Sequence, residues 1–225
     1  MPGRTIAIAD IHGCLAAFDR LLEVLRLQKE DQLVLLGDYV DRGPDSAGVI
    51  DRVLALKEEC EVFTILGNHD ELMLQVIDGE TWKEGHWLAY GGKETLKSYG
   101  LESVEGIPSE HVRFLKDCLP YCESEHHFFT HASYLETKPL KKTPATVLRW
   151  ESLNLRTPGP HKMNKVAVLG HTAQKKTHNI LYLGHLICID TYCYGDGLLT
   201  ALDIHTGEYW QTSQNLEGVL RKRLK

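Results

Sequence analysis

The stretch LVLLGDYVDRGPD, residues 33–45, joins an apolar run directly to a dense group of charges. Gln32 to Leu36 has the composition of a buried strand. Gly37 ends the run, and three aspartates and an arginine follow within eight residues. In α/β proteins, ligands gather beyond the carboxyl ends of strands. The charges therefore lie where a functional site of such a protein is expected.

The segments around this stretch alternate between strand and helix patterns. Such alternation predicts βαβ units on a shared sheet, whereas the second half has mostly β-type runs. We expect one α/β domain, residues 1–225, with two sheets. The predicted strands are 5–9, 32–36, 62–66, 128–130, 166–169, 186–189 and 198–202, with a hairpin turn at 205–208; the predicted helices are 14–27, 44–59 and one from Glu71, followed by a helical middle at 81–119.

The composition is that of a soluble globular protein, with 43% hydrophobic and 25% charged residues. A net charge of −6 disfavours non-specific nucleic-acid binding. No apolar run approaches the ~20 residues of a membrane helix, and we expect no signal peptide. These features predict a cytoplasmic protein without membrane or nucleic-acid partners, whose six cysteines are reduced. The basic tail 221–225 is expected to be a solvated helix end, and 138–160 a surface loop.

Metal-type side chains follow five of the predicted strands. Alone, each has an ordinary explanation, because Asp and Asn are common turn residues and a single His is more often structural. The ordered set is harder to explain by chance. Imidazole, carboxylate and carbonyl oxygen together suit Mn, Fe or Zn, and two ions about 3.5–4 Å apart form a clamp for displacement at phosphorus. The metal-type residues at these strand ends are Asp10, His12, Asp38, Asn68, His69, His131 and His171.

Five motifs resemble the phosphoprotein phosphatase family, within the calcineurin-like metallophosphoesterases. The pattern is most similar to the small bacterial and bacteriophage serine/threonine protein phosphatases. This resemblance implies a two-sheet β-sandwich flanked by helices. The motifs are ADIHG (9–13), LGDYVDRG (36–43), LGNHD (66–70), THASY (130–134) and LGHTA (169–173).

The resemblance also implies a mechanism and a cofactor. Two divalent ions, Mn²⁺ or else Fe or Zn, would hold a bridging hydroxide that attacks phosphorus directly. Asp10, His12 and Asp38 would bind one ion, and Asp38, Asn68, His131 and His171 the other. His69 would be the general acid, paired with Asp41. The phosphate would contact Arg42, Asn68 and, in place of a family arginine, Arg149.

Two positions depart from the family pattern. Leu66 stands where protein phosphatases usually have an arginine, directly before GNH. Ser152 occupies the position two residues after Trp150, where phage-type members have a phosphate-binding arginine; Arg149 precedes that tryptophan instead. The predicted phosphate-binding residues therefore match the family pattern less well than the predicted metal ligands and the acid pair do.

Three functions stay open from the sequence. The leading one is a serine/threonine protein phosphatase that acts on phosphorylated proteins or small phosphoesters. The second is a hydrolase of symmetrical dinucleoside polyphosphates such as diadenosine tetraphosphate. Leu66 favours this group, while Asp41, which the group generally lacks, argues against it. The third, a catalytically inactive binding module, is disfavoured because every ligand position is filled.

Overall fold

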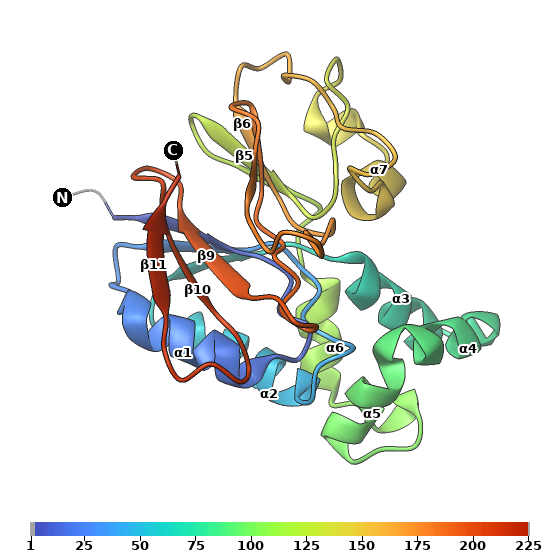
Figure 1. Cartoon of the computed structure of the whole chain (residues 1–225). Coiled ribbons are helices and arrows are strands. Elements are labelled where there is room, and N and C mark those ends of the chain that lie inside the picture. The colour runs from blue at the N-terminus through green and yellow to red at the C-terminus, as the bar shows by residue number, and fades with distance from the viewer. Residues whose placement is uncertain (1–2, 225) are drawn as a thin grey trace.

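The computed structural model describes residues 3–224 and contains two sheets packed face to face (Figure 1). The first has strand order β11-β10-β9-β1-β2-β3, and the second β4-β5-β6-β8-β7. The predicted architecture, a two-sheet sandwich flanked by helices, is confirmed.

The first sheet combines a parallel half with an antiparallel extension. Strands β1, β2 and β3 are parallel, and helices α1 and α2 make the crossovers between them. Strand β9 pairs with β1 in antiparallel fashion and leads into two hairpin partners. The bounds are β1 Thr5–Ile8, α1 Leu15–Leu25, β2 Gln32–Leu35, α2 Ser46–Leu56, β3 Glu61–Thr64, β9 Leu199–Asp203, β10 Glu208–Thr212 and β11 Leu220–Arg223.

The second sheet also has a parallel centre. Strands β5, β6 and β8 are parallel, and short antiparallel strands close both edges. Because the centres of both sheets are parallel, the carboxyl ends of several strands reach one region of the molecule. The bounds are β4 Cys122–Glu123, β5 His127–Thr130, β6 Val166–Leu169, β7 Leu181–Tyr182 and β8 Leu186–Cys188.

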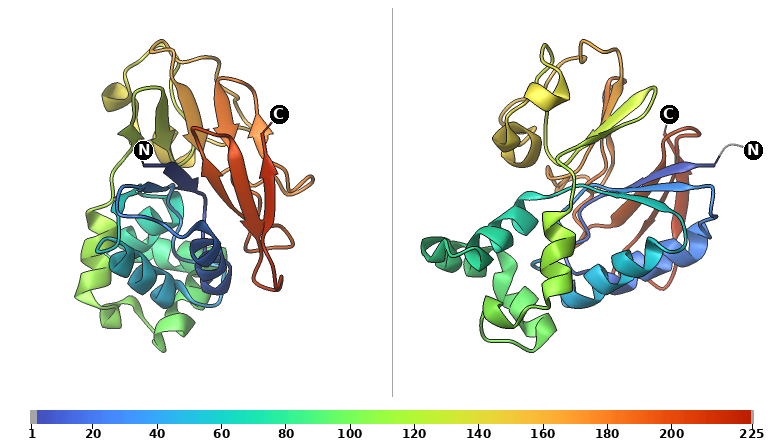
Figure 2. Two further views of the ribbon diagram at one scale, coloured as in Figure 1. Left: turned by 90° about the vertical axis from the view of Figure 1, so that its left-hand side faces the viewer. Right: turned by 180° about the vertical axis from the view of Figure 1, so that it is seen from behind.

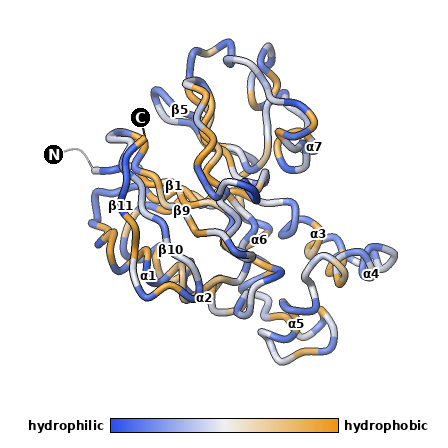
Figure 3. The backbone as a smooth tube through the Cα atoms, in the orientation of Figure 1, coloured by the Kyte–Doolittle hydropathy of each residue, from blue (hydrophilic) through white to orange (hydrophobic). Residues whose placement is uncertain are grey.

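Strand periodicity divides the core into layers. In β1, Ile6 and Ile8 face the helices, whereas Ala7 and, just past the strand, Ala9 face the second sheet, since successive side chains point to opposite faces. A third cluster covers the outer face of the second sheet. Figure 2 shows the helices of the N-terminal half gathered on one side of the first sheet, with the second sheet on the other. Hydrophobic residues concentrate along the central strands (Figure 3).

The helix predicted from Glu71, which precedes the helical middle, begins three residues earlier than the sequence predicted. Helix α3 starts at Asn68 rather than Glu71, because Asp70 in its first turn accepts a hydrogen bond from the backbone N–H of Gly67 at 3.0 Å. Asn68 and His69 are therefore fixed in a helical turn. This helix and the helical middle together comprise α3 Asn68–Ile77, η1 Thr81–Lys83, α4 Glu84–Trp87, η2 Leu88–Gly92, α5 Lys93–Tyr99, η3 Val104–Gly106 and α6 Ser109–Lys116.

Two expectations about surface segments were wrong. The basic tail is solvated, but it forms the edge strand β11 instead of a helix end, with Arg221 Nη2 2.7 Å from Glu208 Oε2; Lys225 lies outside the described residues. The segment 138–160 is not a simple loop, because it contains η4 (Leu140–Lys142) and α7 (Ala145–Trp150). Its buried leucines Leu140, Leu148 and Leu153 cover the second sheet.

The structure also bears on the state of the cysteines and on membrane-spanning helices. All six cysteines are free thiols. Across residues 3–224, no helix is long and apolar enough to cross a bilayer.

Candidate metal centre

The loops after the parallel strands meet around a cavity of about 260 Å³. Five of the six predicted metal ligands line it, and the sixth, His131, lies beside it with Nε2 3.5 Å from Asp38 Oδ2. His69 and Arg42 also line the cavity. The structure thus brings together side chains that are up to 161 residues apart in the sequence. The remaining wall residues are Leu72, His86, Tyr90, Trp150, Asp190 and Tyr194.

The backbone of this site is strained. His12, Asp38, Asp41, Arg42 and His171 all have positive φ, between 47° and 73°, a region that non-glycine residues rarely adopt. Such conformations cost free energy and persist where the surroundings fix them, most often at functional sites.

Asp70 fixes the Asp38 loop. Its carboxylate accepts hydrogen bonds from the backbone N–H groups of Asp38 (2.8 Å), Tyr39 (2.9 Å) and Gly67 (3.0 Å). All three donors would be left without these partners if the carboxylate were removed. Asp70 itself is fully buried, so water would not replace it readily.

We expect Asp70→Ala to lower the free energy of unfolding by at least about 3 kcal/mol, since each unsatisfied buried donor costs roughly 1–3 kcal/mol. Urea unfolding measures the loss. Asp78→Ala is the matched control at the other end of α3, because its exposed ion pair with Lys116 (2.7 Å) should contribute less than about 1 kcal/mol. Equal losses in both variants would contradict the role of Asp70.

Backbone carbonyls fix the tautomers of three histidines. His12 Nδ1 lies 2.9 Å from Val40 O, His131 Nδ1 2.8 Å from Leu36 O, and His171 Nε2 3.2 Å from Trp150 O. A carbonyl only accepts, so each of these nitrogens carries the proton and the other ring nitrogen is bare. Burial lowers the pKa of all three rings, that of His171 to about 4. The rings are therefore neutral, as metal ligands must be.

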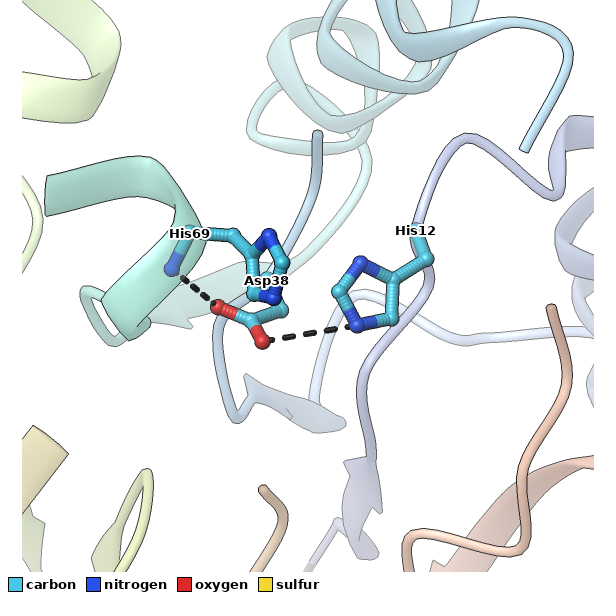
Figure 4. Close-up of side chains that lie close together, drawn as sticks. All are labelled: His12, Asp38 and His69. Atoms are coloured by element: carbon cyan, nitrogen blue, oxygen red, sulfur yellow. Dashed lines mark hydrogen bonds and ion pairs between the residues drawn. The ribbon is translucent and has the colours of Figure 1, made fainter. Parts of the chain in front are cut away.

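The bare nitrogens point at oxygen atoms that also lack protons. His131 Nε2 and His171 Nδ1 lie 3.0 and 2.8 Å from the side-chain oxygen of Asn68. His12 Nε2 lies 3.4 Å from Asp38 Oδ2, as Figure 4 shows. Facing lone pairs repel one another unless a cation lies between them.

Three buried carboxylates add to this need for positive charge. Burial, together with the charges of Asp190 and Asp38, raises the pKa of Asp10 well above its ordinary value. Two groups of residues could each hold an ion: His12–Asp38–His69 and Asp10–Asp38–His131. Within each group, the potential ligand atoms all lie within 4.8 Å of one another. Asp38 belongs to both, and the donor set suits divalent cations that accept nitrogen and oxygen ligands. The residues present therefore fit a two-ion centre.

His69 is held between Asp41 and Arg42. Its Nδ1 lies 2.7 Å from Asp41 Oδ2, and Arg42 Nη2 donates to its Nε2 at 2.9 Å. Burial lowers the pKa of His69, but the charge of Asp38 and the hydrogen bond to Asp41 outweigh it and raise the pKa above its ordinary value. The ring is thus poised to gain a second proton if Arg42 moves away.

Two residues of the helical middle hold Asp41. Trp87 Nε1 donates to Asp41 Oδ1 at 3.0 Å, and Thr95 Oγ1 donates to the same oxygen at 2.8 Å. Thr95 was not among the residues that the sequence singled out. The structure places Trp87 fully buried behind the acid pair, and Tyr90 on the cavity wall.

Arg149 is placed differently from the other predicted phosphate contacts. It pairs with Glu71 Oε1 at 3.2 Å, and its neighbour Trp150, not Arg149, lines the cavity. Trp150 Nε1 donates to the second oxygen of Glu71 at 2.6 Å. A phosphate contact by Arg149 stays a prediction that would require it to leave Glu71.

Sequence reasoning missed two wall residues. Asp190 follows β8 after one further apolar residue, which is the same strand-end pattern that identified the other candidates and could have revealed it. Tyr194 carries no such signal. Its ring centre lies 4.2 Å from the guanidinium carbon of Arg42, a cation–π contact that orients this arginine.

Relatives of two kinds share parts of this sequence. Serine/threonine-protein phosphatase 1 of Salmonella typhimurium is 29% identical over 150 residues, 64% of this chain and 61% of that protein. A symmetrical bis(5'-nucleosyl)-tetraphosphatase of Legionella pneumophila is 42% identical over 82 residues, 36% of this chain and 29% of that protein. The chain thus covers less than two thirds of either relative.

Solved structures share the whole fold. A cold-active protein-tyrosine phosphatase of Shewanella superimposes with a TM-score of 0.71 at 15% identity, over 100% of this chain and 81% of that one. A serine/threonine phosphatase of Saccharomyces cerevisiae gives 0.60 at 14% identity, with the same coverage. At these identities, the likeness concerns the fold alone.

The family model described as calcineurin-like phosphoesterase matches residues 3–214, which is nearly the entire chain. Its extent agrees with the two-sheet fold and with the strand-end cluster of ligand-type side chains. The chain belongs to the calcineurin-like phosphoesterase family.

Proposed function

We propose that the chain is a metal-dependent serine/threonine protein phosphatase. The observation that carries this proposal is the buried pair of His69 and Asp41, with Nδ1 and Oδ2 2.7 Å apart; His69 lines a cavity that five ligand-type side chains also line, with a sixth, His131, beside it. A serine or threonine alkoxide is a poor leaving group, so its release needs a positioned acid.

Two divalent ions, Mn²⁺ or else Fe or Zn, fit this centre. Asp10, His12 and Asp38 would hold one ion, and Asn68, His131 and His171 would hold the other together with Asp38. When bound, the ions activate water and neutralise charge on the phosphate.

The chain's own residues would supply the remaining steps. The phosphate oxygens would draw the fork of Arg42 away from His69 Nε2, where it now donates at 2.9 Å, and Asn68 would add a further contact to the phosphate. The freed nitrogen could then hold the proton that the leaving oxygen requires, while Asp41 stabilises the charged ring. Substrate binding and protonation of the acid would thus be coupled.

A second candidate is hydrolysis of symmetrical dinucleoside tetraphosphates. It is favoured by Leu66, which replaces the usual arginine, and by the Legionella relative that bears this activity in its name. In this reaction the leaving group is a nucleoside diphosphate. Its phosphate oxygen departs more readily than an alkoxide and has less need of an acid.

Turnover by the Mn-loaded protein tests the proposal. We expect kcat/KM for phosphoserine peptides to exceed that for diadenosine tetraphosphate. A preference of orders of magnitude for the dinucleotide would favour the second candidate. Absence of turnover with either substrate, despite bound metal, would favour a binding module.

The hydroxyl of Thr95 should matter for turnover, because it orients the carboxylate that holds the acid. We expect Thr95→Val to lower kcat about tenfold, the scale of one hydrogen bond to a charged group, with little change in KM or metal content. Thr95→Ser keeps the hydroxyl and should restore kcat. Equal losses in Val and Ser variants would indicate a packing role instead.

A further inference from the structure

The cavity continues into two grooves of unlike chemistry. The first, here the aromatic groove, has a volume of about 500 Å³ and lies between α3, η1–α4 and α7 (Figure 1). It shares Leu72, His86 and Trp150 with the metal cavity. Its lining is Glu71, Leu72, Gln75, Trp82, Lys83, His86, Ala145, Thr146 and Trp150.

Both tryptophans of the aromatic groove contact polar neighbours. Lys83 Nζ lies 4.8 Å from the ring centre of Trp82 and 2.8 Å from Gln75 Oε1. Glu71 holds the indole N–H of Trp150 at 2.6 Å. Nevertheless Trp82 is 77% exposed. Large aromatic side chains exposed at the surface beside a cavity are typical of binding sites.

The second groove, here the lysine groove, has a volume of about 580 Å³ and shares Arg42, His171 and Tyr194 with the metal cavity. Lys175 and Lys176 line it and are exposed. Lys175 Nζ lies 5.0 Å from the ring centre of Tyr192. Within residues 3–224, neither lysine has a carboxylate at ion-pair distance, so their charges are available to a ligand.

We propose that these grooves recognise the residues on either side of a phosphorylated side chain in a peptide: an aromatic or large apolar residue in the aromatic groove, and an acidic residue in the lysine groove. The inference rests on the proposed phosphatase function. A symmetrical dinucleotide presents the same groups to both sides of the cleaved bond, whereas these grooves differ in charge and polarity. A peptide has a direction and can match both.

The geometry limits how far the recognised residues lie from the phosphate. Each groove shares wall residues with the metal cavity, and an extended chain advances about 3.3 Å per residue. The recognised side chains therefore lie within about three positions of the phosphoserine.

Phosphoserine peptides that differ only in their flanks test this directly. One carries Trp at the three positions before and Asp at the three positions after the phosphoserine, a second has the reverse order, and a third has Ala at all six positions. We expect one order to exceed both other peptides about tenfold in kcat/KM, which corresponds to 1.4 kcal/mol. Equal turnover of all three would overturn the inference, while turnover of diadenosine tetraphosphate alone would instead overturn the phosphatase function.

Variants assign each preference to its groove. Trp82→Ala should reduce the ratio of kcat/KM between Trp- and Ala-flanked peptides toward one. The double substitution Lys175→Glu and Lys176→Glu should reverse the preference for peptides with an Asp flank over peptides with a Lys flank. Such ratios are insensitive to the folded fraction of a variant. Tyr182→Ala and Lys222→Glu, on edge strands outside both grooves, should keep the wild-type ratios, and retention of those ratios by the groove variants would contradict the proposal.

Discussion

Asp38→Asn should empty the metal centre and lower kcat/KM by at least about a thousandfold, because an amide is neutral and both predicted ions depend on this carboxylate. The amide oxygen can keep the hydrogen bond from the backbone N–H of His69, now 2.9 Å from Oδ1. The amide nitrogen would then replace Oδ2, which faces the bare nitrogens of His12 and His131 at 3.4 and 3.5 Å. It can donate to them and so occupy the space that a cation would take.

Loss of metal and loss of fold have different signatures in the Asp38→Asn variant. In metal-free buffer the variant should unfold at a temperature no lower than the unaltered protein, since a buried charge is removed and bare nitrogens gain donors. Elemental analysis after dialysis measures the ions. Asp45→Asn is the matched control in the same loop, because Asp45 caps α2 through Gly48 N at 2.8 Å and Asn caps equally well. Normal metal content and activity in Asp38→Asn would rule out the bridging role.

Much of this centre was predictable because it is built from local signals. The strands that lead into the centre are short and mostly apolar, and a polar residue follows each of them within a few positions, often beside a glycine. Parallel pairing then brings those ends together, so Asp10, Asp38 and His131 meet although nothing in their own segments specifies the others. Asp190 follows the same rule, because it lies two residues after the end of β8.

The parts that sequence did not predict depend on contacts between distant segments. Thr95 and Trp87 reach Asp41 only because the helical middle folds back on the Asp38 loop. The basic tail has the composition of a solvated helix end, yet pairing with β10 makes it a strand, and tertiary context of this kind overrides local propensity. The two grooves likewise arise where α7 and the 171–177 loop approach the cavity.

His69→Asn tests whether this ring is an acid or a ligand, since the geometry allows either role. Its Nδ1 is committed to Asp41, as an acid requires, but the ring also belongs to one of the two groups that could hold an ion. If it is the acid, the variant keeps its metal content and loses about 10²–10⁴ in kcat on phosphoserine peptides. If it is a ligand, metal is lost as well.

The leaving group supplies a second criterion for His69. A nitrophenolate leaves without protonation, whereas a serine alkoxide does not, so p-nitrophenyl phosphate turnover should fall far less than phosphoserine turnover in His69→Asn. Loss of fold or of metal would instead depress both substrates alike. His126→Asn, a histidine in an exposed turn, should change neither rate. Substrate-dependent loss with retained metal identifies a missing proton donor, whereas an equal fall for both substrates together with loss of metal from a folded variant would assign His69 to the metal and leave the acid to be sought elsewhere on the cavity wall.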